Sequence, residues 1–193
     1  GKTIVAFMGL VAAVEAGGQG AIMAPTEILA RQHFETVLPL AENIDINLNL
    51  LTGRDKGTAR NNKLNDLKEG KTDIIIGTHA LFQSDVVFKD LRLAVVDEQH
   101  RFGVRQRLEL GKKGSAVDLL VMTATPIPRS LALAQYGDMD ISIIREKPPG
   151  RKPIKTALIS SSRIDEVVYK LKQSIADGAQ AYWVCPLIEE SEV

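Results

Sequence analysis

Three short strings in the sequence combine backbone amides, a cation, carboxylates and hydroxyls in ways that suit phosphate chemistry. The first is Gly1-Lys2-Thr3, which opens an apolar helical pattern. Backbone amides at a helix N-terminus attract phosphate, a Lys ammonium can reach β and γ phosphates, and a Thr hydroxyl can bind magnesium. The string matches the end of a phosphate-binding loop, although three residues alone also fit an ordinary helix start.

The second string is an apolar run, residues 93–96, that ends in the adjacent carboxylates Asp97 and Glu98. At a strand end, the first acid can hold magnesium through water, and the second can orient or deprotonate an attacking water. A lone acidic pair is more often a solvated turn. Here strand and helix patterns alternate between Lys2 and Asp97, and such repeats bring strand ends to one edge of a sheet. This arrangement favours the catalytic interpretation.

The third string, residues 121–126, is another apolar run and ends in Thr123-Ala-Thr125-Pro126. The two hydroxyls could hydrogen-bond to Gln99 or His100 and so report the state of a bound nucleotide. The pattern also fits a strand end followed by a helix that begins at proline. The residues themselves favour neither interpretation.

The elements that would position these strings alternate along the chain between short apolar runs and helical patterns. This alternation predicts an α/β fold with a mostly parallel sheet and helices on both faces. Strands are predicted at residues 20–24, 46–51, 73–77, 92–97, 119–123 and 141–145. Helices are predicted at residues 3–16, 26–40, 58–69, 104–112 and 129–136.

A proline-rich and glycine-containing segment, residues 147–153, interrupts this alternation and is predicted to be a linker. It divides the chain into a first lobe, residues 1–146, and the beginning of a second, residues 154–193. The second part predicts strands at residues 154–160 and 181–185 around a helix at residues 162–176. Tyr182 and Trp183 are expected in the core of its last strand.

Composition excludes several classes of protein. The 193 residues carry 24 basic and 24 acidic side chains, so the chain as a whole does not attract polyanions, and any such site must be local. Cys185 is the single cysteine, which disfavours a disulfide scaffold and a zinc site. The longest uncharged apolar stretch, residues 3–14, is shorter than the roughly 20 residues of a membrane span. We therefore expect no membrane partner and a cytoplasmic location.

Together the three strings resemble motifs I, II and III of superfamily 2 helicases. Longer strings are similar to the RecG-type ATP-dependent DNA helicases in particular. They are Asp97-Glu-Gln-His-Arg-Phe-Gly-Val104, Met122-Thr-Ala-Thr-Pro-Ile-Pro-Arg129 and Gln180-Ala-Tyr-Trp-Val-Cys-Pro-Leu-Ile-Glu-Glu-Ser-Glu192. The resemblance implies a RecA-like P-loop lobe, with a second RecA-like lobe beginning after the linker. It also implies ATP and Mg²⁺ as cofactors and branched or double-stranded DNA as the partner.

The resemblance also implies a role for each matching residue. Gly1, Lys2 and Thr3 would bind ATP, Thr3 and Asp97 would hold Mg²⁺, and Glu98 would be the catalytic base. The residues that would couple hydrolysis to movement are Gln99, His100, Thr123 and Thr125. The residues that would contact the DNA backbone are Pro25, Thr26, Thr52, Gly53, Thr78 and His79. Each of the latter follows a predicted strand, so small hydroxyls and amides can converge on one face.

The resemblance implies that the sequence is an internal fragment. A first strand and the rest of the phosphate loop would precede it, as would a wedge domain that binds branched DNA, and most of the second helicase lobe would follow. We expect such a fragment to hydrolyse ATP weakly by itself. The parent protein would remodel forks and junctions in recombination and repair, near the bacterial nucleoid.

Two other functions stay open on the sequence. A transcription-repair coupling translocase shares the Arg-Phe-Gly-Val and Thr-Pro-Ile-Pro-Arg strings, although His100 and the Tyr-Trp-Val-Cys string favour the RecG type. A nucleotide-dependent DNA-binding scaffold without hydrolysis is a hypothesis of another class. The presence of Lys2, Asp97 and Glu98 argues against it, because loss of any of these is the usual sign of an inactive motor.

Overall fold

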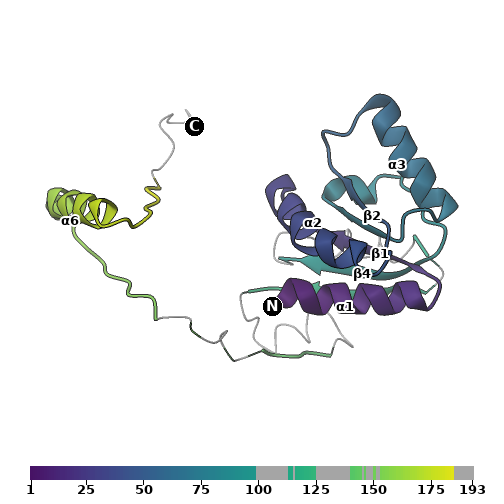
Figure 1. The fold of residues 1–193 in the computed structure, drawn as a ribbon, viewed down its shortest axis with the longest axis horizontal. Helices are drawn as coiled ribbons and strands as arrows, with labels where there is room; N and C mark the ends of the chain where they lie inside the picture. The colour runs from purple at the N-terminus through teal and green to yellow at the C-terminus, as the bar shows by residue number, and fades with distance from the viewer. Residues whose placement is uncertain are drawn as a thin grey trace, which may run out of the picture. The chain divides into compact units, whose positions relative to one another are not determined.

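The computed structural model describes residues 1–98, 113–114, 116–124, 140–144, 146, 150 and 153–184. The chain divides into two units, residues 1–144 and residues 145–193, which are described separately (Figure 1). The predicted helices at 104–112 and 129–136 and most of the predicted linker lie outside the described residues.

A five-stranded sheet with the order β2-β3-β1-β4-β5 forms the centre of the first unit. Its strands are β1 (Gln19–Met23), β2 (Leu48–Leu51), β3 (Ile74–Gly77), β4 (Leu91–Asp97) and β5 (Asp118–Met122). Every neighbouring pair is parallel. The predicted α/β fold with a parallel sheet is therefore confirmed, and the first five predicted strands are present with shifts of one or two residues at their ends.

Helices cover both faces of this sheet (Figure 1). The helices that the structure describes in the first unit are α1 (Lys2–Glu15), α2 (Glu27–Glu42), α3 (Gly57–Glu69) and the short 3₁₀ helix η1 (His79–Phe82). The Thr26 hydroxyl caps α2 by accepting a hydrogen bond of 3.3 Å from the backbone N–H of Leu29. This cap, three residues after β1 ends, fixes the start of α2 at the next residue, Glu27.

Two apolar cores lie on opposite faces of the sheet. Alternate residues of β1 supply both of them, Ala21 and Met23 to one core and Ile22 to the other. The first core includes Leu67 of α3, and the second includes Phe7 of α1 and Val37 of α2. Because both faces are covered, the strands are continuous apolar runs, as expected for a buried parallel sheet.

Gln19 joins separate segments where β1 begins. This side chain is 4% exposed and donates hydrogen bonds to the carbonyls of Leu67 (2.9 Å) and Thr72 (2.7 Å). Its carbonyl oxygen accepts from the backbone N–H groups of Lys89 (2.7 Å) and Asp90 (3.1 Å). One buried amide thus links the end of α3 to the segment before β4, at the amino edge of the sheet.

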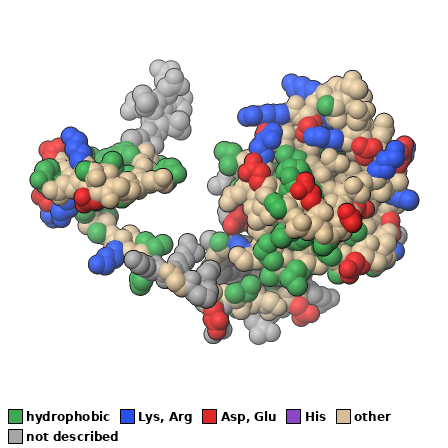
Figure 2. Space-filling view, viewed as in Figure 1, with side chains coloured by type: hydrophobic (Ala, Val, Ile, Leu, Met, Phe, Trp, Pro, Cys, Tyr) green, Lys and Arg blue, Asp and Glu red, His purple; other side chains and the backbone are tan. Residues whose placement is uncertain are grey.

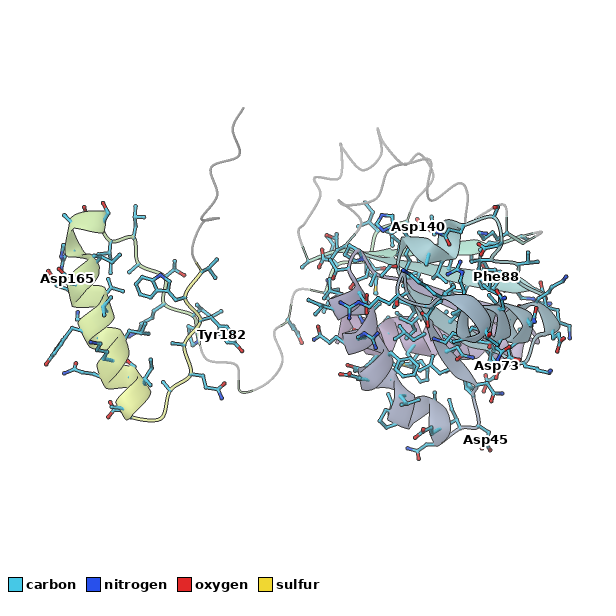
Figure 3. The ribbon with its side chains drawn as sticks, turned by 90° about the horizontal axis from the view of Figure 1, so that it is seen from above. Asp45, Asp73, Phe88, Asp140, Asp165 and Tyr182 are labelled. Carbon is cyan, nitrogen blue, oxygen red and sulfur yellow. The ribbon has the colours of Figure 1, made fainter. Side chains whose placement is uncertain are left out.

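Asp73, which precedes β3 and is labelled in Figure 3, joins two further segments at the same edge. One carboxylate oxygen accepts from both the backbone N–H (2.8 Å) and the side-chain amide (3.0 Å) of Asn47. The amino edge is therefore held together by polar side chains that satisfy backbone groups.

The predicted strand at 141–145 is wrong over residues 141–144, which form no strand. Ile141, Ile143 and Ile144 are 47%, 66% and 69% exposed. An apolar pattern becomes a strand only where a neighbour satisfies its backbone groups, and none pairs with this segment among the described residues.

The second unit contains the predicted helix as α6 (Ile164–Ala176), preceded by η3 (Ser161–Arg163). Asp165 in its first turn is labelled in Figure 3. The predicted strands at 154–160 and 181–185 are wrong over residues 154–160 and 181–184, where no strand forms. Tyr182 and Trp183 are 94% and 50% exposed, so the prediction that they lie in a core is also wrong. Burial requires facing apolar surface, and the described part of this unit has one long helix.

None of the helices that the structure describes has the length and hydropathy that a membrane crossing requires.

Candidate functional site

The sequence-predicted site residues converge because all five strands run in the same direction. Residues that follow parallel strands meet at the carboxyl edge of a sheet. Pro25 follows β1, Thr52 follows β2, Thr78 follows β3, and Thr123 follows β5, while Asp97 ends β4. Gly77 allows the ends of β2 and β3 to approach closely, because a Cβ at this position would clash with the Leu51 carbonyl oxygen.

The start of α1 lies at this same edge, beside the acidic pair. The Lys2 ammonium lies 3.8 Å from the Glu98 carboxylate, and the two side chains are 39% and 25% exposed. Gly1 is the N-cap of α1, and its carbonyl accepts from the backbone N–H of Ile4 at 3.1 Å. The structure therefore brings together the first and second strings, which the sequence separates by most of the lobe.

His33 of α2 joins Thr3 to Asp97. Its Nδ1 lies 3.3 Å from the Thr3 hydroxyl, and its Nε2 lies 2.8 Å from Asp97 Oδ2. The imidazole is 8% exposed, and Asp97 is 7% exposed. Sequence reasoning missed His33 because it has no partner at metal-ligand spacing along the chain, and its two partners are 30 and 64 residues away.

The carboxyl of Asp97 is charged despite its burial. Burial by itself raises the pKa of Asp97, but other effects outweigh it and leave the pKa below its usual range. They are, in decreasing order, the hydrogen bond from His33, the positive charge of Lys2 and the nearby backbone N–H of Glu98. Asp97 is therefore an ionised carboxylate at neutral pH.

The second oxygen of Asp97 suits a hydrated cation. Asp97 Oδ1 is buried and has no hydrogen-bond partner among the described residues. A buried carboxylate oxygen without a partner is costly unless water or an ion satisfies it. No group of three or more His, Cys, Asp or Glu side chains that could hold a metal occurs among the described residues. The Asp97 carboxylate oxygen itself fits Mg²⁺, which commonly uses one or two protein oxygens together with water and substrate phosphate oxygens.

Glu98 has an unusual backbone conformation, with a φ of 50°. Few residues other than glycine adopt the left-handed region, and functional sites are one place where the surrounding structure holds a residue in it. The turn after β4 therefore carries backbone strain at the residue that faces Lys2.

The turn after β2 is built by Asp55 and Lys63. Asp55 accepts a 2.7 Å hydrogen bond from the Thr52 backbone N–H, and Lys63 lies 2.6 Å from the other Asp55 oxygen. Burial tends to raise the pKa of Asp55, but the hydrogen bonds and the charge of Lys63 lower it overall. Thr52 is 1% exposed, so its side chain supports the turn, while Gly53 and Arg54 form its exposed part.

Arg54 lies beside the start of α2, and the sequence analysis missed it. Its guanidinium Nε lies 3.2 Å from Glu27 Oε2, and its side chain is 81% exposed. Glu27 also contacts Arg31, whose guanidinium lies 2.9 Å from Oε1. Figure 2 shows Lys and Arg side chains gathered around α3 and the loop that leads to it. Arg54 could have been identified in the sequence, because it directly follows Thr52-Gly53.

The remaining predicted site residues are partly described. Pro25 is half-buried and Thr26 is exposed, and both lie between β1 and α2. Thr78 is half-buried and His79 is exposed at the start of η1. Thr123 directly follows β5, in which Met122 pairs with Asp97. The other predicted coupling residues, Gln99, His100 and Thr125, lie outside the described residues.

Comparison with known proteins connects this geometry to a family. The family model "DEAD/DEAH box helicase" matches residues 1–133. ATP-dependent DNA helicase RecG of Bacillus subtilis (strain 168) is 50% identical over all of this chain, which spans 28% of that protein. RecG of Thermotoga maritima is 48% identical, also over the whole chain, which spans 25% of its length.

A solved structure agrees with these relatives. The structure described as RecG bound to a three-way DNA junction has a TM-score of 0.79 and 46% sequence identity to this chain. The match covers 97% of this chain and 25% of that one. The fold is thus that of a RecA-like α/β lobe. From the family match over most of its length, and from the site at the carboxyl edge of its sheet, we conclude that the chain belongs to the DEAD/DEAH box helicase family.

Proposed function

We propose that this chain is the ATP-binding part of a RecG-type, ATP-dependent DNA helicase that remodels branched DNA. The observation that carries the proposal is the convergence of Lys2, Thr3, Asp97 and Glu98 at one edge of the sheet. The similarity to RecG proteins supports the same function. Because the chain spans about 28% of such a relative, the activity proposed is that of the whole protein.

Each residue of the nucleotide site would have one task. The amides at the start of α1 and the Lys2 ammonium would bind ATP phosphates, and Thr3 and Asp97 would hold Mg²⁺. Magnesium would supply charge neutralisation at the phosphates. Glu98 would accept a proton from the attacking water, and its contact with Lys2 orients its carboxylate toward the phosphate-binding end of α1.

The segments after β1, β2 and β3 would contact the DNA backbone. Pro25, Thr26, Gly53, Thr78 and His79 are at least partly exposed at the carboxyl edge. Thr26 uses its hydroxyl oxygen to cap α2, so its O–H proton can still be donated to a phosphate. The residues proposed to couple hydrolysis to movement are Gln99, His100, Thr123 and Thr125. A DNA-acting protein of this kind would be located in the bacterial cytoplasm, at the nucleoid.

The decisive experiment measures ATP hydrolysis by the full-length protein alone, with linear duplex DNA, and with a three-way or four-way junction. A RecG-type helicase should hydrolyse ATP fastest with the junction. Equal rates with all three, at saturating ATP and Mg²⁺, would contradict the proposed substrate.

Replacing Arg54 with Ala should weaken junction binding and reduce its dependence on salt. If the Arg54 guanidinium exchanges Glu27 for a DNA phosphate, its loss removes about one phosphate contact and lowers the slope of log affinity against log salt by about 0.9. Fluorescence anisotropy at several salt concentrations measures this slope.

Lys71→Ala is the matched control for Arg54→Ala. Lys71 is another exposed basic side chain paired with a carboxylate, 2.6 Å from Glu69, but it precedes β3 at the amino edge of the sheet. Its replacement should leave the salt slope unchanged. Equal slopes for the wild type and both variants would exclude Arg54 from the DNA interface.

A further inference from the structure

We propose that His33 is a positioning residue, which holds Thr3 and Asp97 so that each presents a free oxygen lone pair to Mg²⁺. The inference rests on the proposed function of the nucleotide site and adds a residue to it. Its basis is a single imidazole whose two nitrogens contact the two expected magnesium-binding side chains, at 3.3 Å and 2.8 Å.

The hydrogen-bonding capacity of the His33 imidazole, the Thr3 hydroxyl and the Asp97 carboxylate determines which oxygen lone pairs stay available for a cation. With the ring proton on Nε2, His33 donates to Asp97 Oδ2, and Nδ1 accepts the hydroxyl proton of Thr3. The Thr3 oxygen then has its lone pairs available for a cation. Asp97 Oδ1 is buried and lacks a partner within the described part of the chain, so it can accept from a water bound to the ion. His33 thus occupies one side of each ligand and leaves the other side for the metal.

His33 is itself unsuited to bind the metal. Both ring nitrogens already have partners, and the ring is 8% exposed. The described residues contain no cluster of His, Cys, Asp and Glu side chains of the kind that holds a transition metal. An imidazole that orients metal ligands through hydrogen bonds acts from outside the coordination sphere, where loss of such a residue typically lowers metal affinity about 10–100-fold.

The packing of α2 fixes the position of this imidazole. Ala30 and Val37, which flank His33 on the buried side of the helix, are both 0% exposed and belong to the core between α1, α2 and the sheet. Asp97 ends β4, in the same sheet that this core covers, and Thr3 lies in the first turn of α1. A rigid ring on a tightly packed helix can therefore set the distance between groups that belong to two other elements.

The test compares His33→Phe with His33→Gln in the full-length protein. Phe keeps the ring but loses both hydrogen bonds, whereas Gln can keep a donor toward Asp97. The readout is binding of Mn²⁺ in the presence of ADP, followed by the electron paramagnetic resonance signal of free Mn²⁺. We expect His33→Phe to weaken Mn²⁺ binding about 10-fold or more, and His33→Gln to weaken it less. Affinity for ADP without metal should stay as in the wild type, because His33 contacts the two expected magnesium-binding side chains.

Gln32→Ala is the control, because Gln32 is the exposed neighbour of His33 on α2. It should bind Mn²⁺ and ADP as the wild type does. Thermal unfolding of each variant identifies loss of fold, and if His33→Phe does not fold, His33→Gln alone decides the question. If the folded His33 variants bind Mn²⁺ with wild-type affinity, the inference about His33 is wrong, whereas the proposed function is unaffected. Failure of the wild-type protein to bind Mn²⁺ with ADP would overturn the proposed function and the inference with it.

Discussion

Glu98→Gln in the full-length protein is expected to lower the rate of ATP hydrolysis about 10²–10⁴-fold, while the protein continues to bind ATP. Gln has nearly the same shape as Glu, but its amide cannot accept a proton from the attacking water. Because the change removes one negative charge 3.8 Å from the Lys2 ammonium, the affinity for the anionic nucleotide should stay equal or rise. Loss of turnover without loss of binding is the signature of a missing base.

The measurement is phosphate release at saturating ATP, with and without junction DNA, beside titration of a fluorescent ATP analogue. Glu69→Gln is the matched control, since Glu69 also pairs with a lysine, at 2.6 Å from Lys71, and is exposed on the opposite edge of the sheet. It should hydrolyse ATP at the wild-type rate. Unchanged turnover in Glu98→Gln would show that Glu98 is not the base.

The same variant separates the helicase from a nucleotide-dependent scaffold. A scaffold would bind DNA in response to ATP and would show negligible turnover in the wild-type protein, so Glu98→Gln would change nothing. Asp97 is charged, its Oδ1 has no partner among the residues that the structure describes, and the backbone of Glu98 is strained. These features instead favour a site prepared for chemistry.

The convergence of the site could be predicted from the sequence because it follows from a few local patterns. Short apolar runs separated by helices indicate parallel strands, and parallel strands place the residues that follow them at one edge. Asp97 and Glu98 end such a run, and Lys2 begins a helix, so their proximity required no knowledge of individual contacts. The 3.8 Å approach of Lys2 to Glu98 has this origin.

Contacts between distant side chains could not be predicted in the same way. His33 lies within an ordinary amphipathic helix pattern, and nothing in the neighbouring residues indicates that its ring meets Thr3 and Asp97. Its place after a strand predicts that Thr52 contacts DNA, but Asp55, three residues later, accepts a hydrogen bond from the Thr52 backbone N–H and holds it in the turn. Such contacts depend on the crossing of whole elements, which the order of residues along one element does not specify.

The wrong strands share one physical cause. Residues 141–144, 154–160 and 181–184 have apolar patterns suited to strands, but a strand also requires a neighbour that satisfies its backbone N–H and C=O groups. Periodicity describes a segment by itself, whereas pairing is a property of two segments. For β1–β5 each strand has such a neighbour.

Gln19→Leu is expected to destabilise the first unit by about 3 kcal/mol, because it removes the partners of several buried backbone groups at once. Leu is close to Gln in size and keeps the apolar contacts. It leaves the carbonyls of Leu67 and Thr72 and the N–H groups of Lys89 and Asp90 without the hydrogen bonds that the amide provided. Each unsatisfied buried group costs about 1–3 kcal/mol, and relaxation recovers part of the sum.

Hydrogen exchange in the full-length protein tests this expectation where the change occurs. The amides of Lys89 and Asp90 now donate to Gln19, so Gln19→Leu should speed their exchange about 100-fold, the factor that corresponds to roughly 3 kcal/mol. Gln32→Leu, an exposed position on α2, controls for the added apolar side chain. The backbone N–H groups of Lys89 and Asp90 could instead be equally protected in the wild type and in Gln19→Leu. Water would then replace the Gln19 side chain at no cost, and the segments before β3 and β4 would be joined by the sheet alone. Faster exchange of these N–H groups in Gln19→Leu, but not in Gln32→Leu, would instead establish that Gln19 holds the amino ends of the strands together. The carboxyl ends of the same strands carry the site.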